Sequence, residues 1–358
     1  MNKHEKYMME CIELARTAEG QTSPNPLVGA VVLDKHGELA GKGYHAKCGE
    51  AHAEVCALDE AGTKAENGTL YVNLEPCSHF GKTPPCADKV IKSGVKKVVI
   101  GMTDPNPLVA GKGIEKLVNV GIEVDCGILN RECKKLNEIF IKHITQKKPF
   151  IAIKTASTID GKIATKTFSS KWITSETARE EVQRLRNKYD AILTGSGTVI
   201  KDNPSLACIN GKSPTRIIID SKLQTPLTSK VYNNDGTKII IATAQESKEN
   251  LPQNIELLQC PLTDKGKIDL NFLVNKLYEK GIMSILIEAG ALLNGAFLKA
   301  ELADKIYLFI APKILGDSHA CSSFEGFSLN NINECINLKF DEIKPFPPDI
   351  MIEAYLSI

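Results

Sequence analysis

Short apolar runs alternate with helically spaced apolar residues over the first 130 residues of the chain. The continuous apolar runs at 28–34, 69–76 and 95–102 predict buried strands. Residues 51–62 and 86–94 show helical spacing and end in glycine, a common helix stop signal. Further helices are expected at 1–20, 114–121 and 131–145, and an extended segment at 122–128. Strands separated by helices of this length predict an α/β domain around a mixed or parallel sheet.

A second series of alternating elements begins after the polar segment 147–149, where we place a domain boundary. Helices are expected at 175–188, 270–280 and 291–300. The pattern predicts about eight strands, at 150–158, 191–200, 215–221, 238–243, 255–260, 284–290, 305–315 and 350–358. We therefore expect two α/β domains, at 1–146 and 149–358.

Composition narrows the protein class without identifying a function. The 358 residues are 42% hydrophobic and 24% charged, which is typical of a soluble globular enzyme. The formal net charge of +1 gives no electrostatic reason to expect nucleic acid or a membrane as a partner. No apolar run approaches the roughly 18–20 residues that span a bilayer. The acidic, amphipathic start is unlike a signal peptide. Eleven scattered cysteines then favour free thiols in a cytoplasmic protein over a disulfide framework.

Candidate chemistry is concentrated at junctions between predicted strands and helices. His52 and Glu54 open one helix, Cys77 ends a strand, and Cys86 opens the next helix. One imidazole and two thiolates are the ligand set of a catalytic zinc that keeps its fourth position open. Zinc lowers the pKa of water in that position to about 7. Glu54 is placed to take the water's proton and pass it to a leaving amine.

The spacing is close to the zinc-deaminase signature, H-x-E followed by P-C-x-x-C. It departs from that signature because eight residues, SHFGKTPP, separate Cys77 from Cys86. This insertion could reach over the site and read a substrate. A structural zinc remains an alternative, with His79 or His45 as a fourth ligand. These residues also have ordinary explanations without a metal. A His-x-Glu at a helix start is usually a surface feature, and a lone cysteine is usually a small core residue.

Two glycine-containing turns stand out in the second half of the chain. Residues 195–198 follow a predicted strand, and residues 290–296 follow another strand and open a helix. Such positions let backbone amides approach a phosphate. The G-x-G-x-x-G fingerprint is absent from them, and tight turns without a ligand explain the spacing about equally well.

Several longer motifs resemble the bifunctional deaminase/reductase family of riboflavin biosynthesis. In the first half these are SPNPLVGAVV, GEAHAEVCAL, LEPCSHFGKTPPC and MTDPNPLVAGKG. The second half carries KTASTIDGKIAT, SKWITS, LTGSGTVIKDNPSL, RIIIDS, IEAGALLNGAFL and IAPKILG. The resemblance covers nearly the whole chain, and the long LEPCSH-x-G-x-TPPC loop is its most specific motif.

The resemblance implies two consecutive reactions. A cytidine-deaminase-like α/β/α domain would hydrolytically deaminate a diaminohydroxyphosphoribosylaminopyrimidine. A dihydrofolate-reductase-like domain would then use NADPH to reduce the ribosyl phosphate side chain to ribityl phosphate. Zinc would be held by His52, Cys77 and Cys86, with Glu54 as the proton shuttle. The deaminase substrate would contact Asn25, His45, Lys82, Asp104 and Asn106. An alternative is a zinc deaminase of a nucleoside or RNA base joined to an unrelated second domain.

For the second domain, the resemblance implies a cofactor pocket beside a substrate site. The NADPH-lining positions would be Ala156, Trp172, Thr198, Asp202, Ser221, Gly290, Ala291, Leu292, Leu293, Asn294, Gly295 and Ala296. Substrate contacts would come from Lys154, Ser170, Arg186, Leu206 and Glu288. Lys154 and Asp202 are the candidate catalytic groups, because hydride transfer to an open-chain ribose needs a nearby cation or acid. Trp172, the single tryptophan, could instead be a core residue.

One position departs from the family pattern. The family usually carries an arginine three residues after the motif DNPSL, where this chain reads Ala207-Cys208-Ile209. Arg186, Lys212 or Arg216 could supply the missing contact with the substrate phosphate. The resemblance also implies a homo-oligomer, either a dimer or a tetramer.

Overall fold

The computed structural model describes residues 1–78, 84–107, 109–209, 211, 213–246 and 251–357. Its internal contacts divide the chain into two units, Met1–Lys147 and Lys148–Ile358. Each unit has its own sheet and its own hydrophobic core.

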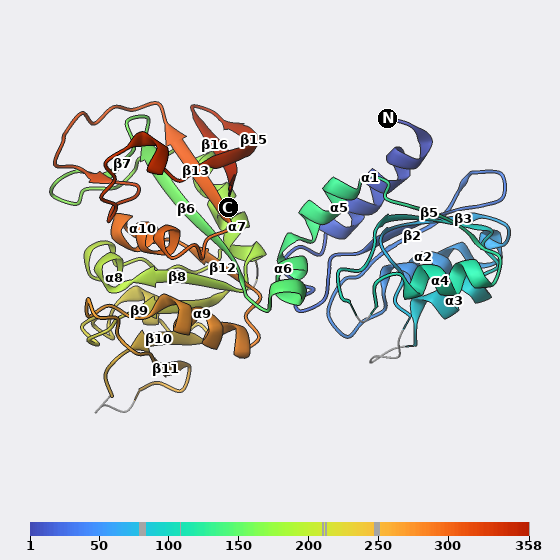
Figure 1. Cartoon of the computed structure of the whole chain (residues 1–358), viewed down its shortest axis with the longest axis horizontal. Coiled ribbons are helices and arrows are strands. Elements are labelled where there is room, and N and C mark those ends of the chain that lie inside the picture. The colour runs from blue at the N-terminus through green and yellow to red at the C-terminus, as the bar shows by residue number, and fades with distance from the viewer. Residues whose placement is uncertain (79–83, 108, 210, 212, 247–250, 358) are drawn as a thin grey trace. The chain divides into compact units, whose positions relative to one another are not determined.

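The first unit is built on a five-stranded mixed sheet with strand order β2-β1-β3-β4-β5 (Figure 1). β1 is antiparallel to β2 and β3, whereas β3, β4 and β5 run parallel. In chain order its elements are α1 (Lys3–Arg16), β1 (Gly29–Leu33), β2 (Leu39–Tyr44), α2 (Ala53–Ala61), the 3-10 turn η1 (Gly62–Ala65), β3 (Thr69–Leu74), α3 (Cys86–Lys92), β4 (Lys97–Met102), α4 (Lys112–Asn119), β5 (Glu123–Cys126), α5 (Asn130–Leu136) and α6 (Glu138–Gln146).

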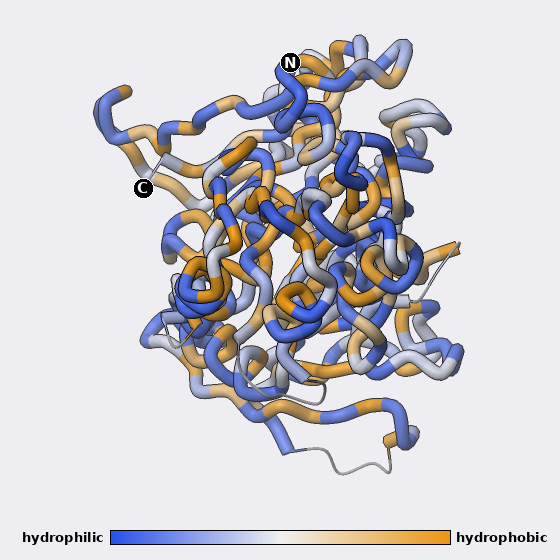
Figure 2. Tube along the Cα trace, turned by 90° about the vertical axis from the view of Figure 1, so that its right-hand side faces the viewer, coloured by the Kyte–Doolittle hydropathy of each residue, from blue (hydrophilic) through white to orange (hydrophobic). Residues whose placement is uncertain are grey.

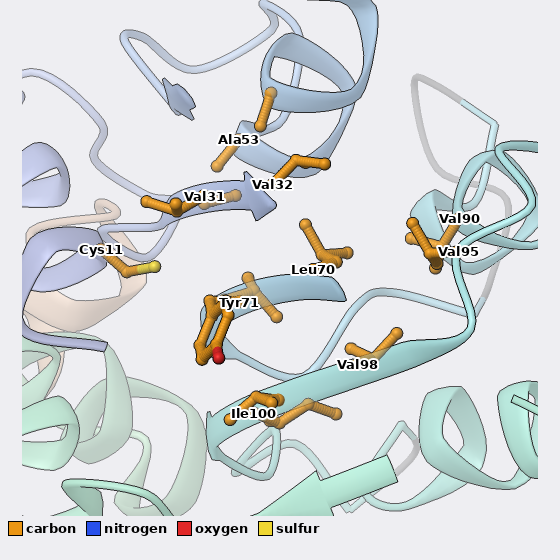
Figure 3. Packing of buried hydrophobic residues seen from close by; sticks show 14 of the residues in the cluster. Cys11, Val31, Val32, Ala53, Leu70, Tyr71, Val90, Val95, Val98 and Ile100 are labelled. Atoms are coloured by element: carbon orange, nitrogen blue, oxygen red, sulfur yellow. The ribbon is translucent and has the colours of Figure 1, made fainter. Parts of the chain in front are cut away.

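Helices cover both faces of this sheet. α1 and α5 pack together on one face, and α2, α3 and α4 form the layer on the other (Figure 1). Figure 3 shows how the core joins the layers, with Cys11 of α1 near Val31 and Tyr71, and with Ala53 of α2 near Val32. The three layers are those expected from the family resemblance.

β2 forms although its sequence, LAGKGY, has weak strand propensity. Its glycines let α2 lie directly on it. A Cβ at Gly41 would come within 2.3 Å of the Ala57 carbonyl oxygen, and one at Gly43 within 2.6 Å of the Ala53 carbonyl oxygen. Close helix packing therefore explains a strand that the apolar pattern did not predict.

The second unit is built on a nine-stranded sheet with order β11-β10-β9-β8-β12-β6-β13-β16-β15. The strands from β11 to β13 are parallel, and β16 and β15 close the sheet as an antiparallel pair. Its elements are β6 (Phe150–Thr158), β7 (Lys162–Ala164), α7 (Glu176–Lys188), β8 (Ala191–Gly195), α8 (Ser196–Asp202), β9 (Thr215–Ile219), η2 (Lys230–Tyr232), β10 (Ile239–Thr243), β11 (Ile255–Gln259), α9 (Leu270–Glu279), β12 (Ser284–Ile287), α10 (Ala291–Lys299), β13 (Lys305–Ala311), β14 (Cys321–Ser322), η3 (Ile332–Glu334), β15 (Leu338–Phe346) and β16 (Asp349–Leu356). β7 and β14 form a separate two-stranded sheet.

One face of the large sheet packs against α9 and α10. Leu273 and Leu277 of α9 and Phe297 of α10 meet alternate strand residues such as Ile285 and Ile287 in a single cluster. Buried parallel strands covered in this way read as continuous apolar runs, which is why most of them were predictable.

Three expectations about elements were wrong. The strand expected at 191–200 ends at Gly195, because Ser196–Asp202 turns into α8. The helix expected at 131–145 breaks at Asn137, a buried residue whose side chain bonds both backbone groups of Leu27. The sheet has nine strands rather than about eight, since β15 was not predicted.

Hydropathy changes every few residues along the trace (Figure 2). Within the described part of the chain, no helix has the length and apolar character needed to cross a bilayer.

Candidate active sites

His52, Cys77 and Cys86 converge in the first unit. Their ligand atoms all lie within 4.8 Å of one another. His52 Nδ1 is 3.1 Å from Cys86 Sγ and 3.8 Å from Cys77 Sγ. The backbone N–H of Cys86 donates to Cys77 Sγ at 3.2 Å. Of the His, Cys, Asp and Glu side chains that the structure describes, these three form the one group that could hold a metal ion.

Each of the three residues stands at an element end that the local sequence sets. His52 is the N-cap of α2 and has extended backbone angles. Cys77 follows the end of β3, after Pro76. Cys86 is the first residue of α3 and follows Pro85 at the N-cap, a position that suits a residue with fixed φ. Parallel strands bring their carboxyl ends and the following helix starts to one edge of a sheet, which is where the site lies.

The donor set fits zinc. Zn–S and Zn–N bonds of about 2.3 and 2.0 Å in a tetrahedron place donor atoms roughly 3.4–3.8 Å apart. The observed separations of 3.1 and 3.8 Å bracket that range. A hydrogen bond from the Cys86 thiol lowers the pKa of Cys77 to about 4, and the same bond, together with burial, raises that of Cys86. A readily formed thiolate is the state in which cysteine binds a metal.

Glu54 lies in the first turn of α2, buried beside this cluster. Burial raises its pKa to about 7, and the charges of Cys77 and His52 act on it in opposite directions. A carboxyl with this pKa can exchange a proton near neutral pH. Its position beside the three donors, and outside their group, agrees with a proton carrier rather than a fourth ligand.

Asn25 and His45 adjoin the cluster. His45 Nδ1 donates to the Ala51 carbonyl oxygen at 3.1 Å, which leaves Nε2 to accept from the Asn25 amide at 3.0 Å. Burial lowers the pKa of His45, which favours this neutral form. The rings of His45 and His52 meet edge to face, with centroids 5.2 Å apart. Two of the expected substrate residues are thus next to the metal cluster.

Asp104 and Asn106 follow β4, the strand next to β3. The Asp104 carboxylate accepts from the Asn106 N–H at 2.8 Å. The Asp104 N–H in turn donates to Glu75 at 3.1 Å. Glu75 was not singled out from the sequence, although a carboxylate directly after an apolar strand run was a usable signal. Lys82 and His79, the other expected residues here, lie outside the described residues.

In the second unit, Lys154, Arg186 and Glu288 form an ionic cluster. Glu288 accepts from Arg186 Nε at 2.6 Å and Nη2 at 3.0 Å, and Lys154 Nζ is 4.0 Å away. Lys154 also lies over the Phe309 ring at 5.7 Å. Burial lowers the pKa of Lys154 against the opposing effect of Glu288. Burial would raise the pKa of Glu288, but Arg186 outweighs it and lowers that pKa.

The two glycine turns come together at the carboxyl ends of the adjacent strands β8 and β12. A Cβ built on Gly290 would meet only Thr198 Oγ1, at 3.9 Å, and one on Gly197 would meet nothing within 4 Å. Neither glycine has a positive φ, so neither packing nor backbone conformation requires it. Gly290 is the N-cap of the nine-residue α10 and makes no side-chain cap. Open space over uncapped helix amides fits the phosphate of a dinucleotide such as NADPH.

The remaining expected residues of this unit lie on β6, on α8, at the start of α10 and in the loops beside them. Ala156 lies on β6, and Gln224, near Ser221, donates to Ser196 at 3.2 Å. Asp202 ends α8 and interacts with Ser170 and Lys171, although burial is the largest influence and raises its pKa. The stretch 290–296 forms the N-cap and first turns of α10.

Trp172 is not a core residue. It is 65% exposed, and its ring lies 4.4 Å from the guanidinium of Arg179. Its backbone carbonyl accepts from Lys313 at 2.9 Å. The core alternative for this residue is therefore wrong, and the exposed ring stays available to a ligand.

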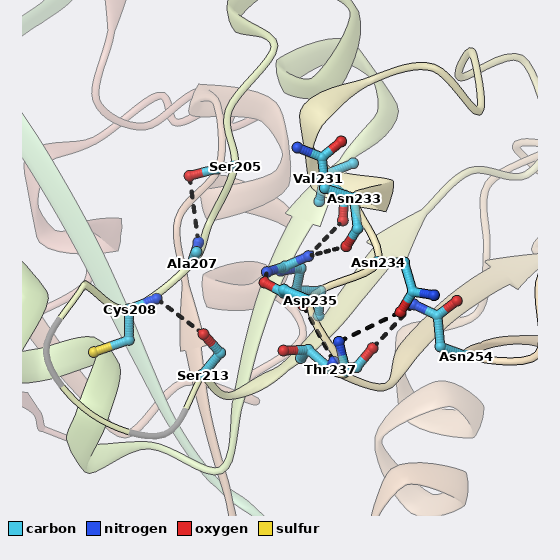
Figure 4. A network of polar contacts seen from close by, with 12 residues as sticks. Ser205, Ala207, Cys208, Ser213, Val231, Asn233, Asn234, Asp235, Thr237 and Asn254 are labelled. Atoms are coloured by element: carbon cyan, nitrogen blue, oxygen red, sulfur yellow. Dashed lines mark hydrogen bonds and ion pairs between the residues drawn. The ribbon is translucent and has the colours of Figure 1, made fainter.

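In the segment that lacks the family's arginine, serine side chains accept hydrogen bonds from the segment's own backbone. Ser205 accepts from the Ala207 N–H and Ser213 from the Cys208 N–H (Figure 4). Leu206, with φ of 51°, is buried and turns the chain so that the Ala207 carbonyl accepts from Arg186 at 3.0 Å.

Both described candidates for the missing phosphate contact already bind other groups of the protein. Arg186 is bound to Glu288 and Ala207. Arg216 is buried, donates to the carbonyls of Val231 and Asn233, and pairs with Asp235. Lys212, the third candidate, lies outside the described residues.

Comparison with known proteins identifies similar sequences over both units. The family model described as the cytidine and deoxycytidylate deaminase zinc-binding region matches residues 1–102. The model described as the RibD C-terminal domain matches residues 149–352. Riboflavin biosynthesis protein RibD of Aquifex aeolicus is 44% identical over 97% of this chain and 96% of its own length. That of Escherichia coli is 40% identical over 97% and 98%.

Solved structures agree over the full length. The Thermotoga maritima diaminohydroxyphosphoribosylaminopyrimidine deaminase/5-amino-6-(5-phosphoribosylamino)uracil reductase aligns with a TM-score of 0.89 and 39% identity, covering 99% of this chain and 98% of that one. Acinetobacter baumannii RibD aligns with a TM-score of 0.87 and 36% identity, covering 99% of both chains. The expected fold of each domain is confirmed.

Proposed function

The chain belongs to the RibD family of riboflavin biosynthesis, and from this premise we propose how its own residues carry out two successive reactions. It is a bifunctional enzyme that deaminates diaminohydroxyphosphoribosylaminopyrimidine and then reduces the ribosyl side chain of the resulting aminouracil phosphate with NADPH. The alternative with an unrelated second domain is wrong, because residues 149–352 match the RibD C-terminal domain.

For the deamination, His52, Cys77 and Cys86 hold the zinc. Zinc in such a site supplies a Lewis acid that makes water a nucleophile near neutral pH. Glu54 accepts the proton of the attacking water and delivers it to the amine, which departs as ammonia. Asn25 and His45 on one side, and Asp104 and Asn106 on the other, orient the pyrimidine. Lys82 completes the proposed set of substrate residues.

For the reduction, the stretch 290–296 with Thr198 binds the cofactor phosphate, and Ala156, Trp172 and Ser221 line the rest of its site. NADPH supplies the hydride. Lys154, held by Glu288, polarises the carbon–oxygen or carbon–nitrogen double bond of the open-chain ribose. Arg186 positions Glu288 and the backbone carbonyl of Ala207, next to Leu206. Asp202, beside Ser170, is the second candidate proton donor, and Asp202→Asn compared with Lys154→Met separates the two.

The observation that carries the deaminase assignment is the group formed by His52, Cys77 and Cys86 with buried Glu54 beside it. A direct experiment gives the purified chain the pyrimidine substrate, first without and then with NADPH. Ammonia release is expected in both cases, and NADPH oxidation should depend on the deaminated product. Ammonia release without any product-dependent NADPH oxidation would contradict the second activity.

We also propose the domains 1–146 and 149–358, a homo-oligomer, and a cytoplasmic location. None of the eleven cysteines forms a disulfide, which suits a reducing compartment. β15 is an edge strand that exposes Phe340, 61% accessible, together with Leu338 and Ile343. Burying these exposed apolar side chains favours contact with another chain, here a second copy. Light scattering should give a dimer or tetramer, and Phe340→Lys should weaken it.

A further inference from the structure

The buried carboxylate of Glu75 gathers four backbone N–H groups from one segment. Oε2 accepts from Asp104 at 3.1 Å and from Gly111 at 3.0 Å. Oε1 accepts from Gly113 at 2.8 Å and from Ile114 at 3.3 Å. A buried carboxylate is costly unless it is hydrogen-bonded, and here both oxygens are satisfied by backbone donors. Asp104 and the start of α4 are therefore tied to one side chain.

Three of these donors belong to the start of α4. Gly111 is the N-cap of this eight-residue helix and provides no side-chain cap. The first amides of a helix have no partner within it and attract negative charge. Glu75, more than thirty residues earlier in the chain, thus acts as the cap that α4 lacks locally.

A second observation shows how closely α4 is pressed against the same segment. A Cβ on Gly113 would come within 2.1 Å of the Pro76 carbonyl oxygen and 3.0 Å of Glu75 Oε1. Only glycine fits at this contact unless the helix start moves. Glu75 and Pro76 immediately precede Cys77, so the strand end that carries a metal donor also seats α4.

The hydrogen bonds continue toward the substrate residues. Glu75 binds the backbone of Asp104, and the Asp104 carboxylate binds the backbone of Asn106. We propose that Glu75 is a positioning residue of the deaminase. It sets the distance between the segment bearing Asp104 and Asn106 and the metal-bearing strand end at Cys77. This inference rests on the proposed function, in which those two residues orient the pyrimidine.

The test compares Glu75→Gln with wild type. Glutamine keeps the size of the side chain, but its amide nitrogen is a donor and cannot accept from two of the four N–H groups. The segment should shift while the zinc ligands stay. The expected result is a deaminase KM raised by about tenfold or more, because small displacements of orienting groups are costly. The fall in kcat should be smaller, zinc should remain at one per chain, and NADPH-dependent reduction of added deaminated product should be unchanged.

Gly113→Ala provides a second route to the same displacement while Glu75 itself stays unchanged, because the added methyl group would push against the Pro76 carbonyl oxygen and the Glu75 side chain; the same KM effect is expected. Asp34→Asn is the matched control, since Asp34 also accepts two backbone N–H groups, from His36 and Glu38, at the β1–β2 turn. It should lower thermal stability without changing KM. Hydrogen exchange at the backbone amides of residues 111, 113 and 114 should accelerate in Glu75→Gln and Gly113→Ala, and stay at the wild-type rate in Asp34→Asn.

The inference is overturned if both variants keep a KM within about twofold of wild type, given the tenfold expectation. Loss of zinc from Glu75→Gln would also overturn it, because Glu75 would then be needed to hold the zinc ligand Cys77 in place rather than to position Asp104 and Asn106. Absence of deaminase activity in the wild-type chain would instead contradict the proposed function itself.

Discussion

Arg186 and Glu288, one on α7 and the other directly after β12, form a two-pronged ion pair with Nε–Oε1 at 2.6 Å and Nη2–Oε2 at 3.0 Å. The pair is largely buried, and Lys154 Nζ lies 4.0 Å from the same carboxylate. Glu288 therefore stabilises two positive charges at once, and the protonation of Lys154 depends on it.

Glu288→Gln should change the pH dependence of the reduction. Burial lowers the pKa of Lys154 and Glu288 opposes that effect, so loss of Glu288 lowers the pKa further. If protonated Lys154 polarises the substrate, the alkaline limb of the reductase pH profile should move to lower pH. NADPH oxidation between about pH 6 and 10 would measure it, spanning the shift expected for a buried lysine. An unmoved limb would contradict this role of Lys154, and Lys154→Met should remove the limb altogether.

Glu54→Gln should abolish deamination while leaving the fold and the metal in place. Loss of a positioned proton carrier typically costs about 10²–10⁴-fold in rate. Ammonia release measures the effect, with zinc content and NADPH oxidation on added deaminated product as controls. Ammonia release at the wild-type rate would refute the assignment of Glu54 and favour a structural zinc.

Metal removal should separate the two activities. Chelation should stop ammonia release and leave reduction of added deaminated product intact, because the three donors lie within the first unit. Cys77→Ser should likewise lose zinc, whereas Cys56→Ser on the neighbouring helix α2 should keep one zinc per chain. Equal loss of both activities on chelation would argue against this division.

The Glu353 carboxylate should make the second unit acid-sensitive. Burial would raise its pKa, but Lys305 and Lys344, both at 3.0 Å, lower it to about 2. A depressed carboxyl pKa adds stability above about pH 4.5, and that stability is lost as the pH falls toward 2. The free energy of unfolding of the wild type, measured with denaturant, should therefore fall as the pH drops across this window. Glu353→Gln should make that free energy less dependent on pH.

Glu353→Gln should also cost about 3–5 kcal/mol at neutral pH, since it leaves the buried Lys305 without its counter-charge. The double variant Lys305→Met/Glu353→Leu should recover most of this loss. A single variant as stable as wild type would show that the pair contributes little.

Sequence patterns predicted elements whose apolar residues are buried on both sides. β6, β9, β10, β12 and β13 all read as continuous apolar runs. β15 was missed because most of its positions are exposed, so no burial constraint shapes its sequence. β2 was missed for a different reason, since the closeness of α2 demands glycine at residues 41 and 43.

The metal site was predictable because its residues stand at element ends marked by local signals. Pro76-Cys77 indicates the end of a strand, and Pro85-Cys86 indicates the start of a helix. His52 and Glu54 lie at the start of another helix. The supporting contacts were not predictable, because they join residues far apart in sequence. Asn137 bonds Leu27 across 110 positions, and no local pattern encodes that contact.

The order of strands in the large sheet has a consequence for how the protein is made. β16 (Asp349–Leu356) comes last in the sequence but lies between β13 and β15. A ribosome therefore delivers an interior strand after all the other strands of its sheet. The first unit can complete its sheet during synthesis, while the second waits for its final segment. Removing that segment by truncation would expose the edge of β13 and leave β15 without its partner.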